Sequence, residues 1–399
     1  MLPDFALRLR AYADVIVRVG LNLQRGQRLL ITEPYDLQGV ARSAEVIVEA
    51  VKIAALEAGC PHSAGIEVIW GDGARLREYA LNRDWRGFVQ LVDGNARRMQ
   101  ASIQNQDALL FLQGSQPTLL DDIPSESAGE LRRIGWEHFG PIAQQLVQGA
   151  ANWTVAPAPS PGWAKIVYAD LPSAGRLAAL WESVFEAMRI SPSTDPLAAW
   201  LAHLQALEKC RDALNAQRLK TLRYQGAGSD LTVTLPPEHL WFTAQLTAKS
   251  GRPFVANLPT EEVFTLPHRD SAEGTVRVSR PVNYGGAVID GIELEFRHGR
   301  VVQAAARTND ALLQQMLTTD EGASRLGEVA LVLHATSLAR SGRLFHHPLL
   351  DENAGNHIAL GEAYAFCLRS PNPAALNRSL IHVDLPLDAR VVLSKLEPS

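Results

Sequence analysis

The sequence predicts an α/β protein with two domains: an N-terminal α/β domain with a mainly parallel sheet, and a β-rich α+β C-terminal domain. Helical and strand patterns alternate through the first half, as in a parallel sheet covered by helices. From about residue 221, short alternating strands with glycine-containing turns replace this pattern. We therefore expect domains at residues 1–220 and 221–399, which agrees with a usual domain size of roughly 100–200 residues.

The first half of the chain contains the predicted helices and strands of the parallel sheet domain. Residues 4–20 place apolar side chains three and four positions apart and end at Gly20, which predicts an amphipathic helix. The apolar run in RLLITEP, after Gly26, predicts a buried strand. Further strands are predicted in IEVIW, DALLFLQGS and NWTVAPAP, and further helices at residues 37–58, 86–104 and 127–148.

The second half begins after a change in composition. Residues 157–163, PAPSPGW, are rich in Pro, Gly and Ser and predict a crossover segment, which helical patterns at 174–189 and 197–216 follow. Strands are then predicted in DLTVTLP, GTVRVSRPV, GGAVIDGIELEF and RVVQAAA. In FRHGRVV, His298 and Gly299 stand between two strand patterns and predict a hairpin turn.

Composition and charge exclude several classes of function. A hydrophobic content of 46% and a charged content of 20% are typical of a globular protein, and a net charge of −5 offers no basic surface for nucleic acid. Charged residues interrupt every apolar run near the N-terminus, so we expect no membrane partner and a cytoplasmic location. The three cysteines, Cys60, Cys210 and Cys367, are too far apart in sequence to indicate a disulfide framework or a thiolate zinc site.

Carboxylates and imidazoles within apolar segments of the last third are the main functional signal. Carboxylate and imidazole bind Zn, Mn, Co and non-haem Fe, and a carboxylate-rich set favours two adjacent cations. These residue types predict a dinuclear metallohydrolase. The candidate residues are Glu261 and Glu262 in NLPTEEVFT, Glu328 in LGEVALVL, Glu352, His357 and Tyr364 in DENAGNHIALGEAY, and His382 and Asp384 in SLIHVDLPL.

The spacing of two of these residues predicts a shared face. Side chains two apart in a strand point the same way, so His382 and Asp384 would present an imidazole and a carboxylate together. The alternative is the exposed polar face of an amphipathic strand. Glu328 lies in an apolar strand, where burial without a cation or partner is costly, unless it heads the strand at the surface.

A helix is predicted for the segment that contains His357 and Tyr364. Seven residues make about two helical turns, so the two side chains would share a stripe, with Glu352 near the start of the helix. A phenol on that face could donate a hydrogen bond to a metal-bound oxygen. The alternative is a histidine at the edge of the core and a tyrosine whose hydroxyl reaches solvent.

An ordered series of motifs resembles a known family. PTEEVFTLP, LGEVALVL, LFHHPLLDENAGNHIALGEAY and NRSLIHVDL, with WAKIVYADLPSAG and LTVTLPPEHLW upstream, resemble the thermophilic aminopeptidases of peptidase family M29, the aminopeptidase T and aminopeptidase S group. The resemblance implies a cytoplasmic metalloaminopeptidase that acts on peptides with a free N-terminus. It also implies a homodimer with two divalent cations, usually zinc or cobalt, in the C-terminal domain; manganese or magnesium would also suit such ligands.

By motif, the resemblance implies Glu328 as a ligand that bridges the two cations and Tyr364 as the active-site tyrosine. The other implied ligands are Glu262, Glu352, His357, His382 and Asp384. In the mechanism that we expect, the cations activate a bridging water and polarise the scissile carbonyl. Tyr364 would donate to the developing oxyanion, and Glu261 or a loosely held ligand would pass a proton to the leaving amine.

Two other interpretations stay open. His357, His382 and Asp384 could form the two-histidine, one-carboxylate triad of a mononuclear iron dioxygenase that opens ring substrates, although such a triad does not need the additional glutamates. The chain could also be a catalytically inert, metal-stabilised dimeric scaffold. Metal content together with hydrolysis of aminoacyl anilides would distinguish the three.

Overall fold

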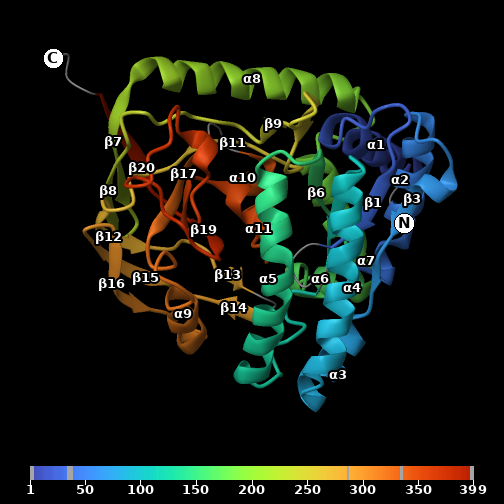
Figure 1. The fold of residues 1–399 in the computed structure, drawn as a ribbon, viewed down its shortest axis with the longest axis horizontal. Coiled ribbons are helices and arrows are strands. Elements are labelled where there is room, and N and C mark those ends of the chain that lie inside the picture. Colours follow the sequence, from blue (N-terminus) through green and yellow to red (C-terminus); the bar gives the residue numbers. More distant parts are fainter. Residues whose placement is uncertain (1–3, 34–38, 115, 285–286, 333–335, 396–399) are drawn as a thin grey trace. The chain divides into compact units, whose positions relative to one another are not determined.

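The computed structural model describes residues 4–33, 39–114, 116–284, 287–332 and 336–395 (Figure 1). The chain forms two compact units, of which the first comprises Met1–His203 and Ala244–Thr260 and the second Leu204–Thr243 and Glu261–Ser399. The unit boundary lies inside α8 (Pro196–Gln217), and residues 244–260 return to the first unit. The expected division into domains at residues 1–220 and 221–399 stays a prediction.

The first unit contains the predicted parallel sheet. Its strand order is β3 (Ile66–Val68), β1 (Leu29–Thr32), β5 (Ala108–Gln113) and β6 (Trp153–Pro157), and all neighbours are parallel. β1 is buried along its whole length because helices cover both faces of such a sheet, which explains its continuous apolar sequence. A short parallel pair, β2 (Val40–Ala41) and β4 (Trp70–Gly71), and an antiparallel pair, β9 (Gln245–Thr247) and β10 (Pro253–Val255), complete the strands described in this unit.

Most helices of the first unit match their predicted positions. They are α1 (Phe5–Val15), which continues as a π-helical turn to Gly20, α2 (Glu45–Glu57), α4 (Trp85–Gln104), α5 (Ser125–Val147) and α7 (Ser173–Ala187). Figure 1 shows α4 and α5 side by side. α2 begins later than the predicted residue 37, because β2 and a 3-10 turn precede it; residues 37 and 38 lie outside the described ranges.

Two helices of the first unit were not predicted. α3 (Gly73–Asn82) begins after Asp72, whose carboxylate accepts hydrogen bonds from the first-turn amides of Ala74 and Arg75. α6 (Pro161–Val167) begins inside the segment that was expected to be a crossover, with Ser160 as its N-cap and proline at its first position. Both helices are short, so their capping residues resemble loop sequence.

The second unit contains a six-stranded antiparallel sheet. Its order is β16 (Arg300–Ala305), β15 (Glu293–Arg297), β12 (Glu273–Arg277), β8 (Ser229–Thr234), β7 (Leu219–Gly226) and β20 (Arg390–Lys395). The predicted β15–β16 hairpin is confirmed. Its turn residues, His298 and Gly299, have φ values of 50° and 74°, as a two-residue turn between twisted strands requires. Smaller elements of the unit are β13 (Val282–Tyr284), β14 (Ala287–Ile289), α9 (Asp310–Leu317), α10 (Ser337–Ser341) and α11 (Pro348–Asp351).

A separate four-stranded antiparallel sheet of the second unit carries most of the candidate residues. Its order is β11 (Glu262–Thr265), β17 (Leu326–Val332), β18 (His357–Gly361) and β19 (His382–Pro386). One face packs into a large hydrophobic core through Val263, Val329, Leu331, Ile358, Leu360, Val383 and Leu385. Because side chains alternate along a strand, the residues between them share the opposite face.

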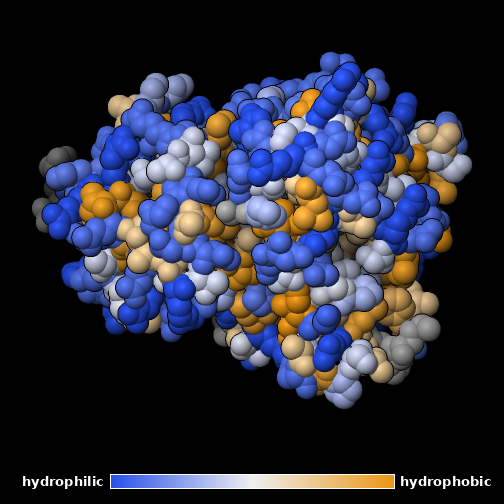
Figure 2. Space-filling model, turned by 90° about the horizontal axis from the view of Figure 1, so that it is seen from below, coloured by the Kyte–Doolittle hydropathy of each residue, from blue (hydrophilic) through white to orange (hydrophobic). Residues whose placement is uncertain are grey.

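The distribution of hydrophobic residues on the surface agrees with the globular composition of the sequence. On the face in Figure 2, hydrophobic residues lie in small groups among hydrophilic ones. Within the described ranges, no helix combines the length and the apolar character that crossing a membrane requires.

Candidate metal centre

The register of the four-stranded sheet brings the candidate ligands onto one face. Glu328 on β17 pairs with Ala359 on β18, and Ala359 in turn pairs with Asp384 on β19. His357 pairs with Ala330, and His382 pairs with Gly361. Residues paired across antiparallel strands point to the same side, so small alanine and glycine residues separate the ligands and leave room above the sheet.

A β-bulge at Gly327 gives Glu328 its orientation. The register shifts between Leu326, which pairs with Leu360, and Glu328. Without the extra residue, Leu326 and Glu328 would share a face; with it, Leu326 joins the hydrophobic core and Glu328 turns to the opposite side. A Cβ at Gly327 would lie 2.3 Å from the carbonyl oxygen of Glu362, so this close approach of two strands needs glycine.

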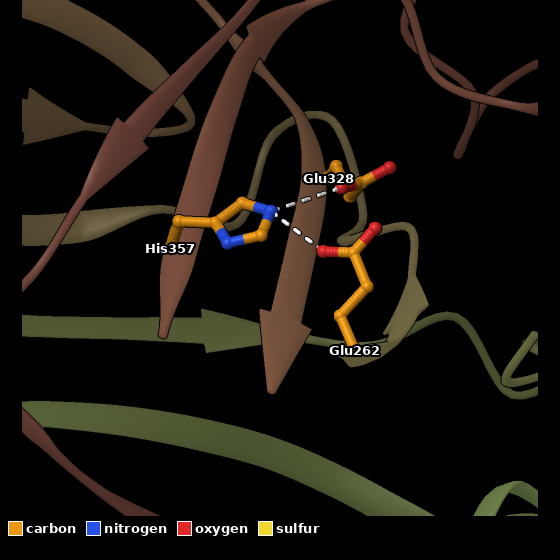
Figure 3. Close-up of side chains that lie close together, drawn as sticks. All are labelled: Glu262, Glu328 and His357. Atoms are coloured by element: carbon orange, nitrogen blue, oxygen red, sulfur yellow. Dashed lines mark ion pairs between the residues drawn. The ribbon is translucent and has the colours of Figure 1, made fainter. Parts of the chain in front are cut away.

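The deeper part of the site consists of Glu262, Glu328 and His357. The Nε2 atom of His357 lies 3.0 Å from Oε2 of Glu262 and 3.6 Å from Oε1 of Glu328 (Figure 3). All three side chains are buried, and His357 is only 1% exposed. Among the described residues, Oε2 of Glu262 has no partner in hydrogen-bonding geometry despite this short distance. Such an arrangement fits ligand atoms that surround a cation.

The outer part of the site consists of Glu328, His382 and Asp384. The Nε2 atom of His382 lies 3.5 Å from Oδ1 of Asp384 and 3.9 Å from Oε2 of Glu328. The side chains of His382 and Asp384 are 21% and 18% exposed, so this part lies nearer the surface. Glu328 belongs to both groups and directs a different oxygen at each histidine.

Backbone carbonyls orient both histidines. The Nδ1 atom of His357 lies 3.3 Å from the carbonyl oxygen of Gly355, and Nδ1 of His382 lies 2.8 Å from that of Glu362. A carbonyl oxygen only accepts hydrogen bonds, so each Nδ1 carries a proton. Each Nε2 is therefore directed at the carboxylates and can serve as a metal ligand once it is unprotonated.

Burial and mutual charge shift the pKa of the carboxylates. Burial raises the pKa of Glu328, and burial with the charges of Asp384 and Glu262 raises that of Glu352 well above its ordinary value. Burial also opposes ionisation of Asp384, but its hydrogen bonds to His382 and Glu352 and the charges of His382 and His357 together outweigh burial and lower the Asp384 pKa to about 2.

The pKa values of both histidines are raised. Burial lowers the pKa of His357, but the charges of Glu262 and Asp384, with the close approach of Nε2 to the Glu262 and Glu328 carboxylates, together outweigh burial and raise it well above its ordinary value. Burial likewise opposes protonation of His382, but the hydrogen bond and charge of Asp384, with the charge of Glu328 and the Glu362 carbonyl, together outweigh burial and raise the His382 pKa to about 9. In the protein alone, the histidines thus act as cations for a carboxylate-rich cluster, a role that metal ions could take.

The remaining candidates lie around these groups. Glu352 lies in a 3-10 turn, Glu352–Ala354, and shares a hydrogen bond with Asp384. Tyr364 stacks on the ring of His382, with centroids 5.0 Å apart and planes inclined by 27°. Glu261 is buried next to Glu262, and its backbone amide donates to Oδ1 of Asn353. Neither Glu261 nor Glu352 belongs to the two three-residue groups found among the described residues.

The predicted helix through His357 and Tyr364 is wrong. His357–Gly361 is the strand β18, hydrogen-bonded on both sides, and Tyr364 follows it in a loop before a 3-10 turn, Ala365–Cys367. Pairing with β17 and β19 decides this segment, because a short apolar run fits helix or strand equally well. Tyr364 consequently approaches the site through His382 and not along a shared stripe with His357.

Two residues that shape the site, Gly327 and Asn353, were not among the candidates predicted from the sequence. Gly327 interrupts an apolar strand, and an isolated glycine in a strand pattern is a known signal of a bulge. Asn353 follows Glu352 in sequence and is fully buried, but nothing in the sequence distinguishes it from a loop asparagine.

Among the described residues, the sheet face therefore presents two groups that could hold a metal ion and that share Glu328, a carboxylate-rich donor set typical of hydrolytic metal sites. Comparison with known proteins agrees. The family model described as "Thermophilic metalloprotease (M29)" matches residues 5–392, and the chain belongs to this family.

The individual relatives that resemble this chain are named as aminopeptidases. Aminopeptidase T of Thermus thermophilus is 37% identical over 95% of this chain and 92% of its own length, and aminopeptidase AmpS of Bacillus subtilis is 34% identical over 98% and 94%. The solved structure of wild-type AmpT from T. thermophilus superposes with a TM-score of 0.88 at 35% identity, covering 98% of this chain and 96% of that one. The predicted family, the α/β fold class and the metalloaminopeptidase class are thereby confirmed.

A more distant likeness concerns the fold alone. The structure of 2,5-dihydroxypyridine dioxygenase from Pseudomonas putida KT2440 superposes with a TM-score of 0.50 at 14% identity, over 98% of this chain and 95% of that one. An architecture shared at this level does not carry function with it.

Proposed function

We propose that the protein removes N-terminal amino acids from peptides with two divalent cations held on the four-stranded sheet. The observation that carries this proposal is the position of Glu328. Its Oε1 atom lies 3.6 Å from Nε2 of His357 and its Oε2 atom lies 3.9 Å from Nε2 of His382. A carboxylate that directs its two oxygens at two separate histidines is suited to bridge two cations.

The donor set supports this assignment. Glu262, Glu328 and His357 would hold the deeper cation, and Glu328, His382 and Asp384 would hold the outer one. Glu352, hydrogen-bonded to Asp384, would contribute a further oxygen. Oxygen and nitrogen ligands suit zinc or cobalt, and also accept manganese or magnesium. When bound, such cations activate water and polarise a carbonyl group.

The other residues of the chain have separate tasks in this proposal. The carbonyl oxygens of Gly355 and Glu362 keep each Nε2 directed at the site. The Tyr364 hydroxyl would donate to the oxyanion that develops on the peptide carbonyl. Glu261 would carry a proton to the leaving amine; its burial beside Glu262 is compatible with this role. Substrate would enter beside His382 and Asp384, the more exposed ligands.

Three further expectations follow from family membership. We propose that the protein acts as a homodimer and in the cytoplasm, on peptides with an unblocked N-terminus. Size-exclusion chromatography with light scattering would test the first point. Hydrolysis of a peptide compared with its N-acetylated form would test the substrate class.

The decisive experiment measures metal content and turnover together. We expect about two divalent ions per chain and release of p-nitroaniline from leucine or arginine p-nitroanilide that a chelator abolishes. Glu328→Gln should lose both the metal and the turnover, whereas Glu293→Gln, at an exposed position of β15 in the same unit, should lose neither.

The other outcomes select the alternatives. One iron per chain without peptidase activity would indicate a mononuclear dioxygenase. Bound metal without turnover on any unblocked peptide would indicate an inert, metal-stabilised scaffold. Against the first alternative, Glu262 and Glu328 both lie within 4 Å of His357, so the histidine is surrounded by more carboxylates than a mononuclear iron triad uses.

A further inference from the structure

Asn353 lies between two of the carboxylates assigned to the metal centre and touches the chain around both. Its side chain is only 1% exposed, which is unusual for asparagine unless the amide is fully hydrogen-bonded. It immediately follows Glu352, but it also reaches the start of β11, which lies about ninety residues earlier in the sequence. These contacts give it a position that connects two distant segments of the site.

The two ends of the Asn353 amide have different partners. Oδ1 accepts a hydrogen bond of 2.6 Å from the backbone amide of Glu261, directly before Glu262. Nδ2 donates at 3.3 Å to Oε1 of Glu352 and at 2.8 Å to the carbonyl oxygen of Leu349. One end therefore holds the backbone beside Glu262, and the other holds the carboxylate of Glu352.

The backbone of Asn353 is itself held in place. The hydroxyl of Thr336 donates to the carbonyl oxygen of Asn353 at 3.1 Å, and the same hydroxyl accepts from the amide of Ala339 as the N-cap of α10. The amide side chain thus extends from a fixed turn and not from a mobile loop. A rigidly held residue can determine where its partners lie.

We propose that Asn353 is a positioning residue of the metal centre, which sets the carboxylate of Glu352 relative to Glu262 and so determines how tightly the centre binds its cations. This inference rests on the proposed dinuclear site. Groups that hydrogen-bond to metal ligands fix their orientation, and their loss commonly lowers metal affinity by about 10–100-fold. Asn353 contacts the backbone next to Glu262 and the carboxylate of Glu352. Its removal should therefore lower metal affinity more than removal of a group that contacts only one proposed ligand.

Two substitutions separate the two ends of the amide. Asn353→Asp is isosteric and keeps an oxygen for the Glu261 amide, but it replaces the donor to Glu352 with an oxygen. Asn353→Ala removes all three hydrogen bonds of the amide. We expect about a 10-fold weaker affinity for zinc or cobalt in Asn353→Asp and up to about a 100-fold weaker affinity in Asn353→Ala.

The measurement is metal affinity of the full-length, metal-stripped protein, by competition with a chromophoric chelator. It needs no substrate. Absorption spectra of the cobalt-loaded variants would report a changed ligand field in addition. Recovery of affinity in Asn353→Gln would not be expected, because the longer side chain displaces the amide from both partners.

Asn152→Ala provides the matched control. Asn152 is also 1% exposed, donates to the carbonyl oxygen of Leu21 and accepts from Gln27, but it belongs to the first unit. It should lower the melting temperature without weakening metal binding. Wild-type affinity in both Asn353 variants would overturn the inference while leaving the proposed function intact, whereas a wild-type protein that binds no cation would overturn both.

Discussion

The ring of Tyr364 stacks on the ring of His382, with centroids 5.0 Å apart and an interplanar angle of 27°. A residue expected to contact substrate thus packs directly on an expected ligand of the outer cation. The stacking and the hydroxyl are separable contributions, because phenylalanine retains the ring and loses only the oxygen.

Tyr364→Phe should therefore retain the metal and lose turnover. Removal of one donor to a developing oxyanion typically lowers kcat by about 10²–10³-fold. Kinetics on leucine p-nitroanilide, together with metal analysis of the same sample, would measure both effects. Wild-type kcat in this variant would remove Tyr364 from the mechanism. Tyr364→Ala should in addition weaken metal binding, since His382 loses its stacking partner.

Glu328 and Asp384 should differ in how many ions their loss releases. Glu328 belongs to both ligand groups and Asp384 only to the outer one. We expect Asp384→Asn to keep the deeper ion and Glu328→Gln to retain almost no metal. Native mass spectrometry would count the ions on each variant. Equal losses in both would contradict a bridging role for Glu328.

The floor of the site should tolerate no larger side chain. Ala359 lies between Glu328 and Asp384 in the sheet and is completely buried. Ala359→Val keeps good strand propensity but fills the space above the sheet, so metal affinity should fall by about 10-fold or more. The matched control is Ile358→Val, on the core face of the same strand, which should cost about 0.5–1.5 kcal/mol of unfolding free energy and leave metal affinity unchanged. Calorimetry with metal titration distinguishes the two.

Gly327→Ala should disturb the bulge that orients Glu328. The new Cβ would meet the Glu362 carbonyl oxygen at 2.3 Å, and this same oxygen accepts the hydrogen bond from His382. We expect a loss of about 1–3 kcal/mol in unfolding free energy and weaker binding of the outer ion. Chemical denaturation of the metal-free variant would measure the first, and chelator competition the second. A stable variant with unchanged metal affinity would show that the strand relaxes without moving His382.

The metal-free protein should lose stability as the pH rises above neutrality. The pKa of His382 is raised from 6.5 to about 9, so its protonation stabilises the folded state fully below pH 6.5 and not above about pH 9. The pKa of Asp384 is lowered from 3.8 to about 2, so its contribution is complete above pH 3.8 and is lost as the pH falls through about 2.

Thermal unfolding with a chelator should therefore show a falling melting temperature between pH 6.5 and 9. The metal-loaded protein should lack this decline, because a cation replaces the proton on His382 and binds more tightly at higher pH. Parallel scans with and without zinc would measure the difference. Identical pH profiles would mean that no cation displaces this proton.

Much of the fold followed from patterns that local sequence determines. Residue preference and periodicity predict the same structure in three elements. These are the buried strand β1, the hairpin turn at His298 and Gly299, and the strand that carries His382 and Asp384. The strand β18 was not predicted from such patterns, because pairing with the strands on either side determines the conformation of its five residues. The face of Glu328 also could not be derived from periodicity, since the bulge at Gly327 breaks the alternation that such a derivation uses.

The composition of the site was more predictable than its geometry. Motifs identified the ligand candidates, but not that Tyr364 packs on His382 or that Asn353 connects the surroundings of Glu262 and Glu352. Those relationships depend on chain segments far apart in sequence, which meet only in the folded protein.

The difference in burial between the two histidines has a kinetic consequence. With His357 1% exposed and His382 21% exposed, an ion at the deeper position would exchange slowly with solvent, whereas an ion at the outer position would leave and return quickly. Enzyme dialysed against metal-free buffer should then pass through a half-loaded form. The cations available in the surrounding medium would determine which ion occupies the outer position. A single polypeptide could therefore have different metal compositions as its supply of cations changes.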